Sequence, residues 1–135
     1  MPINSRVLIS MFMCLTIVSF CSAAYAADML SVEEAVVCEG VEDRAPVSAG
    51  TSFPISVSRL YLFTRITGAQ TPTEVTHVWY YGDTERARVN LTIKASNWRT
   101  YSSKKLQEHE IGAWRVEVLG PTGEILKTVR FEVVQ

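Results

Sequence analysis

Six aromatic and basic side chains have the chemistry best suited to binding a ligand. They lie in two stretches of the sequence, residues 77–88 and residues 98–101. Indole and phenol rings offer flat amphipathic surfaces, and a guanidinium group can hold a carboxylate through two parallel hydrogen bonds. Such a set would suit a sugar, a peptide or a carboxylate-bearing partner. The candidate binding residues are His77, Trp79, Arg88, Trp98, Arg99 and Tyr101.

The orientation of this cluster depends on a predicted β-hairpin between residues 74–81 and 86–95. If the loop consists of the residues between these strands, Trp79 lies opposite Arg88 and shares the outer face of the sheet with His77. A loop of odd length would reverse the alternation and bury both rings. The alternative interpretation is that the tryptophans pack half-buried in the sheet under arginine cover. In the exposed arrangement the core receives the alternate residues Val78 and Tyr80.

Patterns typical of catalysis or metal binding do not occur. There is no G-x-S-x-G motif, and Ser102-Ser103-Lys104 lacks the S-x-x-K spacing that sets a lysine one helical turn from a serine. The side chains that could bind a metal lack ligand spacing. We therefore predict no catalytic residue, no metal site and no cofactor. The side chains considered as ligands are His77, His109, Cys38 and Met29.

Alternating polar and apolar residues predict the strands that must position these side chains. The clearest case is residues 86–95, in which five apolar residues alternate with polar ones. The apolar residues are Ala87, Val89, Leu91, Ile93 and Ala95. Further strands are expected over 34–41, 56–66 (with Leu60, Leu62 and Ile66 on one face), 74–81, 114–118 and 129–133, and a turn over 120–123.

The remaining segments are predicted to be irregular. Pro46, Gly50 and Pro54 indicate a loop over 42–54, and residues 104–110 form a charged connection. Residues 98–103 are expected to form a short strand or an extended corner. Six or seven short strands separated by turns favour an all-β fold. We predict an immunoglobulin-like β-sandwich or a related Greek-key barrel.

The N-terminus has the features of a secretory signal. Arg6 is the only charge before an apolar run over residues 7–20, and small residues at Ala24 and Ala26 fit an A-x-A cleavage site. The run is shorter than the roughly 20 residues of a membrane span, although an uncleaved anchor is the alternative. We expect cleavage after Ala26, which leaves a single domain over 27–135 without a membrane span.

Cysteine content and net charge bear on whether the domain forms disulfides or binds nucleic acid. Cys14 and Cys21 lie in the signal, so Cys38 would remain alone and could not form an internal disulfide. We expect it to be buried; an intermolecular disulfide and a ligand or redox role are the alternatives. The chain has 13 basic and 14 acidic residues, a balance that argues against nucleic-acid binding.

Four segments together resemble a known family. Residues 59–64, 75–79, 98–104 and 112–118 occur in an order similar to that of DUF2914, a bacterial envelope family classed as a domain of unknown function. The resemblance covers about residues 36–134. It implies an envelope location and a compact β domain, and it assigns no catalytic residue.

These observations predict a non-enzymatic accessory or interaction domain that is periplasmic or secreted. Its partner would be an envelope protein or a glycan. The alternative is a carbohydrate- or peptidoglycan-directed binding module or enzyme that uses the aromatic and basic surface. The two hypotheses differ in geometry, because the second needs a concave patch that joins Trp79, Trp98 and Arg99 beside a pair of carboxylates.

Overall fold

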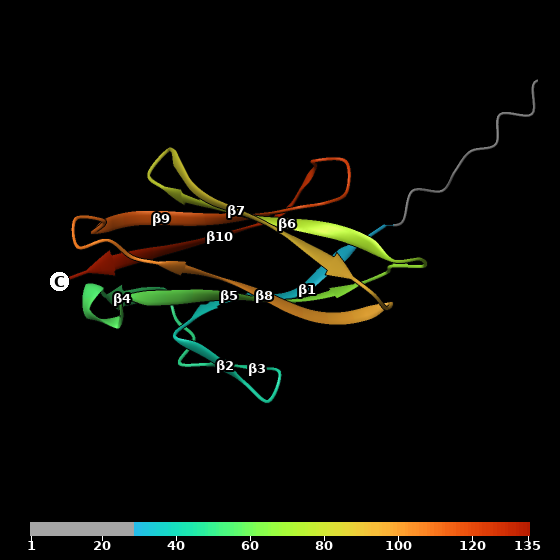
Figure 1. Ribbon diagram of the computed structural model, residues 1–135, viewed down its shortest axis with the longest axis horizontal. Coiled ribbons are helices and arrows are strands. Elements are labelled where there is room, and N and C mark those ends of the chain that lie inside the picture. The colour runs from blue at the N-terminus through green and yellow to red at the C-terminus, as the bar shows by residue number, and fades with distance from the viewer. Residues whose placement is uncertain (1–28) are drawn as a thin grey trace, which may run out of the picture.

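Two β-sheets form two layers, and a small hairpin lies against the outside of one of them. The computed structural model describes residues 29–135, so the predicted signal and its two cysteines lie outside the described residues. One sheet has the strand order β1-β5-β8 and the other β4-β10-β9-β6-β7. The separate β2-β3 hairpin projects below β5 and β8, on the side away from the five-stranded sheet (Figure 1).

The described residues contain ten strands and one short 3-10 turn. The strands are β1 (Ser31–Cys38), β2 (Gly40–Glu42), β3 (Ala45–Val47), β4 (Ser52–Pro54), β5 (Arg59–Thr67), β6 (Thr73–Tyr81), β7 (Thr84–Ile93), β8 (Asn97–Lys105), β9 (Gly112–Leu119) and β10 (Ile125–Val134), and the turn is η1 (Ile55–Val57).

The predicted all-β sandwich class is confirmed, with ten strands rather than six or seven. The extra strands lie mainly in 42–54, which was predicted to be a loop. Asp43 and Arg44 close a two-residue hairpin there, and β4 pairs in parallel with the C-terminal strand β10. Residues 98–103, predicted to be a short strand or a corner, belong to the nine-residue strand β8. No helix within residues 29–135 is long and apolar enough to cross a membrane.

The core lies between the two sheets and is centred on aromatic rings. Phe131 of β10 contacts three of them, with centroid distances of 6.1 Å to Trp79, 5.9 Å to Trp114 and 6.2 Å to Phe53. The three-stranded sheet contributes the face predicted for it, because Leu60, Leu62 and Ile66 are all fully buried. The predicted C-terminal hairpin is also confirmed, with a turn closed by Gly123 N–H donating to the Gly120 carbonyl.

The β6-β7 hairpin differs from the predicted pairing. Its loop consists only of Gly82 and Asp83, and Arg86 has no partner because the register shifts between Trp79 and Tyr80. Arg86 is therefore the extra residue of a β-bulge, which reverses the alternation of the strand beyond it. Trp79 consequently lies opposite Ala87. It faces the core, in register with the buried Val116 of β9.

The prediction that His77 and Trp79 lie on an outer face is therefore wrong. Both are fully buried, and the partner of Arg88 is Val78. Tyr80, predicted to join the core, is half-buried under the Arg115 guanidinium, 4.1 Å from its ring centroid. Among the five apolar residues of the predicted strand 86–95, Ile93 is buried, Ala87, Val89 and Leu91 are half-buried, and Ala95 is exposed beyond the end of β7.

A buried ion pair holds the bulge. The Arg86 Nε lies 2.8 Å from Oε2 of Glu110, whose side chain has no exposed surface. The Gln107 N–H donates to the other carboxylate oxygen at 2.8 Å, and Trp114 Nε1 donates to the Glu110 carbonyl at 2.9 Å. These bonds satisfy the carboxylate and join β7 to the connection between β8 and β9.

The lone thiol of the described residues is buried, as predicted. Cys38 has no exposed surface, and its Sγ lies 3.8 Å from the Tyr61 carbonyl. Burial raises the pKa of the Cys38 thiol, while nearby backbone groups of Gly40 and Val47 act in the opposite direction. Burial and the raised pKa both lower the reactivity of the thiol in the folded protein.

Trp79→Ala should destabilise the protein strongly. Removing a fully buried indole leaves a cavity beside Phe131, so the free energy of unfolding is expected to fall by about 3–5 kcal/mol. Denaturant melts will measure this. Tyr101→Ala is the matched control, because half of its side-chain surface is exposed and its loss should cost about 1 kcal/mol or less. Equal losses for the two variants would contradict the burial of Trp79.

Arg86→Met should leave Glu110 as a buried charge without its cation. The expected loss of stability is about 3–5 kcal/mol, and the double variant Arg86→Met/Glu110→Gln should recover part of it. Arg88→Met is the control, because its ion pair with Glu85 is exposed and is worth about 1 kcal/mol or less. Strictly additive losses in the double variant would show that the two side chains are not coupled.

Candidate functional site

The six predicted binding residues occupy three separate places. His77 and Trp79 lie in the core, and Arg88 lies on β7, where it forms an exposed ion pair with Glu85 at 2.7 Å. The three others lie on β8. The single surface predicted for all six does not exist, because His77 and Trp79 face the core in register with Val118 and Val116 of β9. On β8 only Arg99 and Tyr101 share the outer face, since Trp98 is in register with the buried Ile66 and packs against the core.

A chain of hydrogen bonds joins the two sheets through His77. The Thr64 hydroxyl donates to the Thr100 carbonyl at 3.0 Å, so its oxygen accepts from His77 Nε2, 3.3 Å away. His77 Nδ1 then accepts from the Ser102 hydroxyl at 2.7 Å. The Ser102 oxygen in turn accepts from Trp79 Nε1 at 3.1 Å. A neutral imidazole protonated on Nε2 satisfies every group.

The contact between Ser102 and His77 has the geometry of a nucleophile and a base, but its surroundings oppose that role. Burial lowers the pKa of His77 to about 4, so the imidazole is a weak base near neutral pH. His77 has no exposed surface and Ser102 is 4% exposed, so no substrate reaches them. The network instead fixes β5 and β8 against β6.

The outer face of the three-stranded sheet carries the accessible chemistry. The inward residues of β5 and β8 alternate with outward ones, and the outward set contains four cations, three aromatic rings and no acid. We call this set the basic-aromatic face. It consists of Arg59, Arg65, Arg99, Lys105, Tyr61, Phe63 and Tyr101, and the two tyrosine rings meet edge to face at 6.0 Å.

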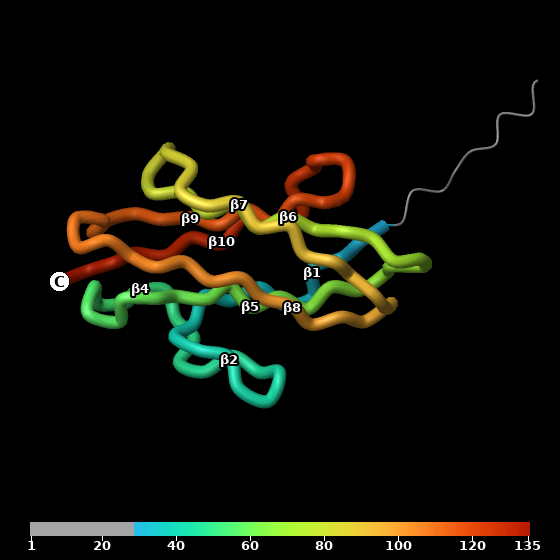
Figure 2. Tube along the Cα trace, viewed as in Figure 1, coloured from blue at the N-terminus to red at the C-terminus, as the bar shows by residue number. Residues whose placement is uncertain are grey.

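The β2-β3 hairpin crosses this face and covers Phe63. Figure 2 shows the hairpin running outside β5 and β8. Its turn has positive φ at both central residues, 50° at Asp43 and 59° at Arg44. Asparagine and glycine are the residues favoured in such a turn, and the left-handed conformation costs an ordinary side chain roughly 1 kcal/mol or more. Arg44 therefore occupies a strained position at the tip of the hairpin.

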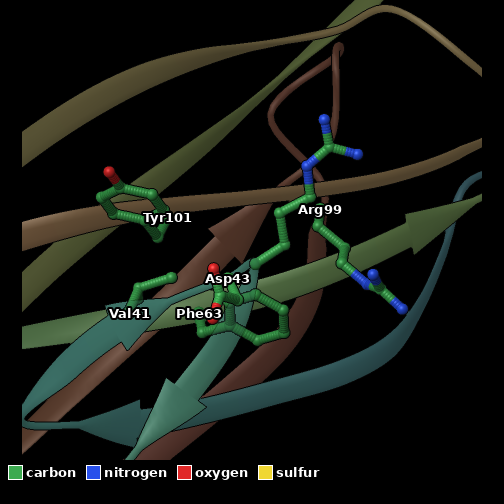
Figure 3. A pocket seen from close by; sticks show the side chains of 6 residues that line it. Val41, Asp43, Phe63, Arg99 and Tyr101 are labelled. Atoms are coloured by element: carbon green, nitrogen blue, oxygen red, sulfur yellow. The ribbon is translucent and has the colours of Figure 1, made fainter.

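Two recesses lie beside the hairpin tip. One, of about 280 Å³, contains Asp43 and the rings of Phe63 and Tyr101; the other, of about 290 Å³, contains Asn97 and Trp98. Figure 3 shows the first recess, with Arg99 and Tyr101 coming from the sheet and Val41 and Asp43 from the hairpin. Both recesses are lined by the same two arginines, Arg44 and Arg99.

The charge around the recesses is only partly balanced. Within residues 29–135, Arg44, Arg65 and Arg99 form no ion pair within 4.0 Å. Arg65 lies between Arg99 and Glu34 in the strand register, so two like charges are direct neighbours across β5 and β8. Adjacent like charges destabilise a sheet, and a bound anion relieves them.

Five of the residues that line the two recesses were not predicted. They are Val41, Asp43, Arg44, Phe63 and Asn97. The alternation of residues 56–66 does place Phe63 and Arg65 on the face opposite Leu60 and Leu62, and that pattern was the available signal. Nothing comparable identifies the hairpin. In the part of the chain that the structure describes, no group of three His, Cys, Asp or Glu side chains could hold a metal.

Acid should weaken the fold through His77. The pKa of His77 falls from an ordinary 6.5 to about 4 on folding. Below pH 6.5 His77 is therefore protonated in the unfolded chain but stays neutral in the folded protein until the pH approaches 4. The free energy of unfolding is expected to drop by about 2 kcal/mol between pH 7 and pH 5. Denaturant melts across this range will test it. His77→Gln should lose the slope and His109→Gln should keep it; the same slope in all three proteins would rule out His77 as its source.

Comparison with known proteins gives a family match and a distant structural likeness. The sequence matches no curated protein. A similar solved structure is the GH3 β-glucosidase of Bifidobacterium adolescentis, with 11% identity and a TM-score of 0.44. The match covers 77% of this chain and 17% of that enzyme, so the chain spans a small part of its length.

The family match falls on the C-terminal half. It begins just before β6, includes β8 with Trp98, Arg99 and Tyr101, and ends within β10, so it leaves out β5 and the β2-β3 hairpin. The predicted resemblance is confirmed over this segment. Residues 72–133 of the chain match DUF2914, a family described as proteins of unknown function.

Proposed function

We propose that this protein is a non-enzymatic interaction domain of the bacterial envelope, periplasmic or secreted, and that it binds through the basic-aromatic face. One observation carries the proposal: the outward positions of β5 and β8 hold four cations and three rings, and the acid that β1 adds to this face is Glu34, opposite Arg65. The chain as a whole has 13 basic and 14 acidic residues, so the excess of cations belongs to this face and not to the overall composition.

The geometry of the recesses supports binding rather than catalysis. Asp43 is the one carboxylate lining them, whereas hydrolysis of a glycosidic bond ordinarily requires a pair. The side chains that line them supply donors and flat apolar surfaces, which orient a ligand without activating a nucleophile. The Ser102–His77 contact lies on the other side of the sheet and is closed to solvent.

Two features support a place in the envelope. The first is the secretory pattern at the N-terminus, with the small residues Ala24 and Ala26 after an apolar run. The second is the resemblance to an envelope family. The buried thiol Cys38 suits an oxidising compartment, because it is kept from forming mixed disulfides.

Site-specific crosslinking in cells will test the proposal. A photoreactive residue replacing Tyr101 should give adducts with an envelope component, because this side chain is half exposed on the basic-aromatic face. The same residue replacing Ile125, which is 61% exposed on β10, is the matched control and should give none. The intact mass of the protein without a crosslink should correspond to a chain that begins at Ala27. Identical adducts at both positions, no adduct at Tyr101, or a cytoplasmic protein would contradict the proposed function.

A further inference from the structure

Two arginines are shared by the recesses. Arg44 comes from the hairpin tip and Arg99 from β8, and each of the two recesses is lined by both. Neither guanidinium has an acidic partner within 4.0 Å among residues 29–135. Guanidinium groups without an acidic partner are suited to the planar, two-oxygen geometry of a carboxylate.

The backbone of Arg44 is a second, independent observation. Its φ of 59° belongs to a conformation that glycine or asparagine adopts at lower cost. The side chain makes no hydrogen bond or ion pair within the described part of the chain that would compensate this cost. A strained residue that contributes nothing visible to folding is best explained by a contact made outside the fold.

The surfaces on either side of the arginines indicate what carries the anion. One recess offers the Tyr101 ring and the Asp43 carboxylate. The other offers the Asn97 amide, whereas the ring of Trp98 lies on the inward side of β8, against the core. An aromatic ring beside a small planar hydrogen-bonding group suits the two faces of a sugar, apolar on its C–H side and polar at its hydroxyls. Each volume is near the lower end of the roughly 300–1,000 Å³ typical of small-molecule pockets, which favours one ring per recess.

An extended peptide fits this arrangement less well. Peptides that add to a sheet lie along a strand edge and place alternate side chains in a continuous groove. Here the recesses lie on the face of the sheet, and they are bounded by the hairpin that crosses it at Phe63. The available space is short and divided in two.

We propose that the two recesses bind a carboxylate-bearing saccharide, with the carboxylate held between Arg44 and Arg99 and a sugar ring against Tyr101. This inference rests on the proposed function, and it names the ligand class of the same face. Uronic acids and lactyl-substituted sugars are examples of that chemistry.

Titration of the purified protein with three matched probes will test the inference. The probes are a galacturonic acid trisaccharide, the neutral galactose trisaccharide and triglutamate, followed by heteronuclear NMR. The acidic saccharide should shift the resonances of Arg44, Arg99 and Tyr101. The neutral one should bind at least about tenfold more weakly, because a charged hydrogen-bonded contact is worth about that factor or more.

Arg44→Gly is the most informative variant. It removes the guanidinium but suits the left-handed backbone, so its denaturation midpoint should equal or exceed that of the unmodified protein while its affinity falls about tenfold or more. Arg99→Lys keeps the positive charge but loses the planar pair of N–H donors that matches a carboxylate, so it should also weaken binding. Arg88→Gln, on the other sheet, should bind as the unmodified protein does.

Three results would overturn the inference. These are no binding of the acidic saccharide, equal binding of triglutamate through the same residues, and full affinity in Arg44→Gly. If any of them occurs while Tyr101 still crosslinks to an envelope component, the ligand class is wrong and the proposed function stands. Loss of the crosslink as well would remove both.

Discussion

The buried Glu110 carboxylate places a strict constraint on this fold. It has no exposed surface, so it must be neutralised, and its cation is Arg86, the unpaired residue of the bulge in β7. The bulge in turn sets how β7 pairs with β6, with Ala87 opposite Trp79. On the other side of β6, Trp79 is in register with the buried Val116 of β9 and contacts Phe131. One buried charge is therefore tied to the register of the hairpin that borders the aromatic centre of the core.

The inward orientation of β6 also determines where binding chemistry can lie. His77 and Trp79 become the donors and acceptors that engage Thr64 and Ser102 on the opposite sheet. Because residues of a strand alternate, fixing Thr64 and Ser102 inward fixes Phe63 and Tyr101 outward. The buried network and the basic-aromatic face are thus two sides of the same pair of strands, and the polar groups in the core hold the outer face in place.

Much of the fold could be predicted from the sequence, because alternation over eight or ten residues is a strong signal. The strands corresponding to β5, β6, β7 and β9–β10 were anticipated, as were the buried positions of Leu60, Leu62 and Ile66. The bulge was not, since Arg86 looks like any outward-facing polar residue of a strand and its partner Glu110 is distant in sequence. The hairpin at Asp43–Arg44 was missed because arginine is not a residue that signals such a turn. Both errors affected the candidate site. Of the six predicted residues only Arg99 and Tyr101 share the outer face of β8, and the residues that complete the site come from β5 and the hairpin.

The position of Cys38 gives the hairpin a measurable property of its own. The thiol lies directly before β2, close to the backbone of Gly40 and Val47, and it is closed to solvent while the hairpin is seated. Local opening of the hairpin would uncover sulfur and Phe63 together, without unfolding either large sheet. In the regime where closing is faster than alkylation, the rate of thiol modification equals the opening equilibrium constant multiplied by the reactivity of a free cysteine. The rate of Cys38 modification therefore reports how often the β2-β3 hairpin opens. A ligand that binds to the closed hairpin will lower that rate.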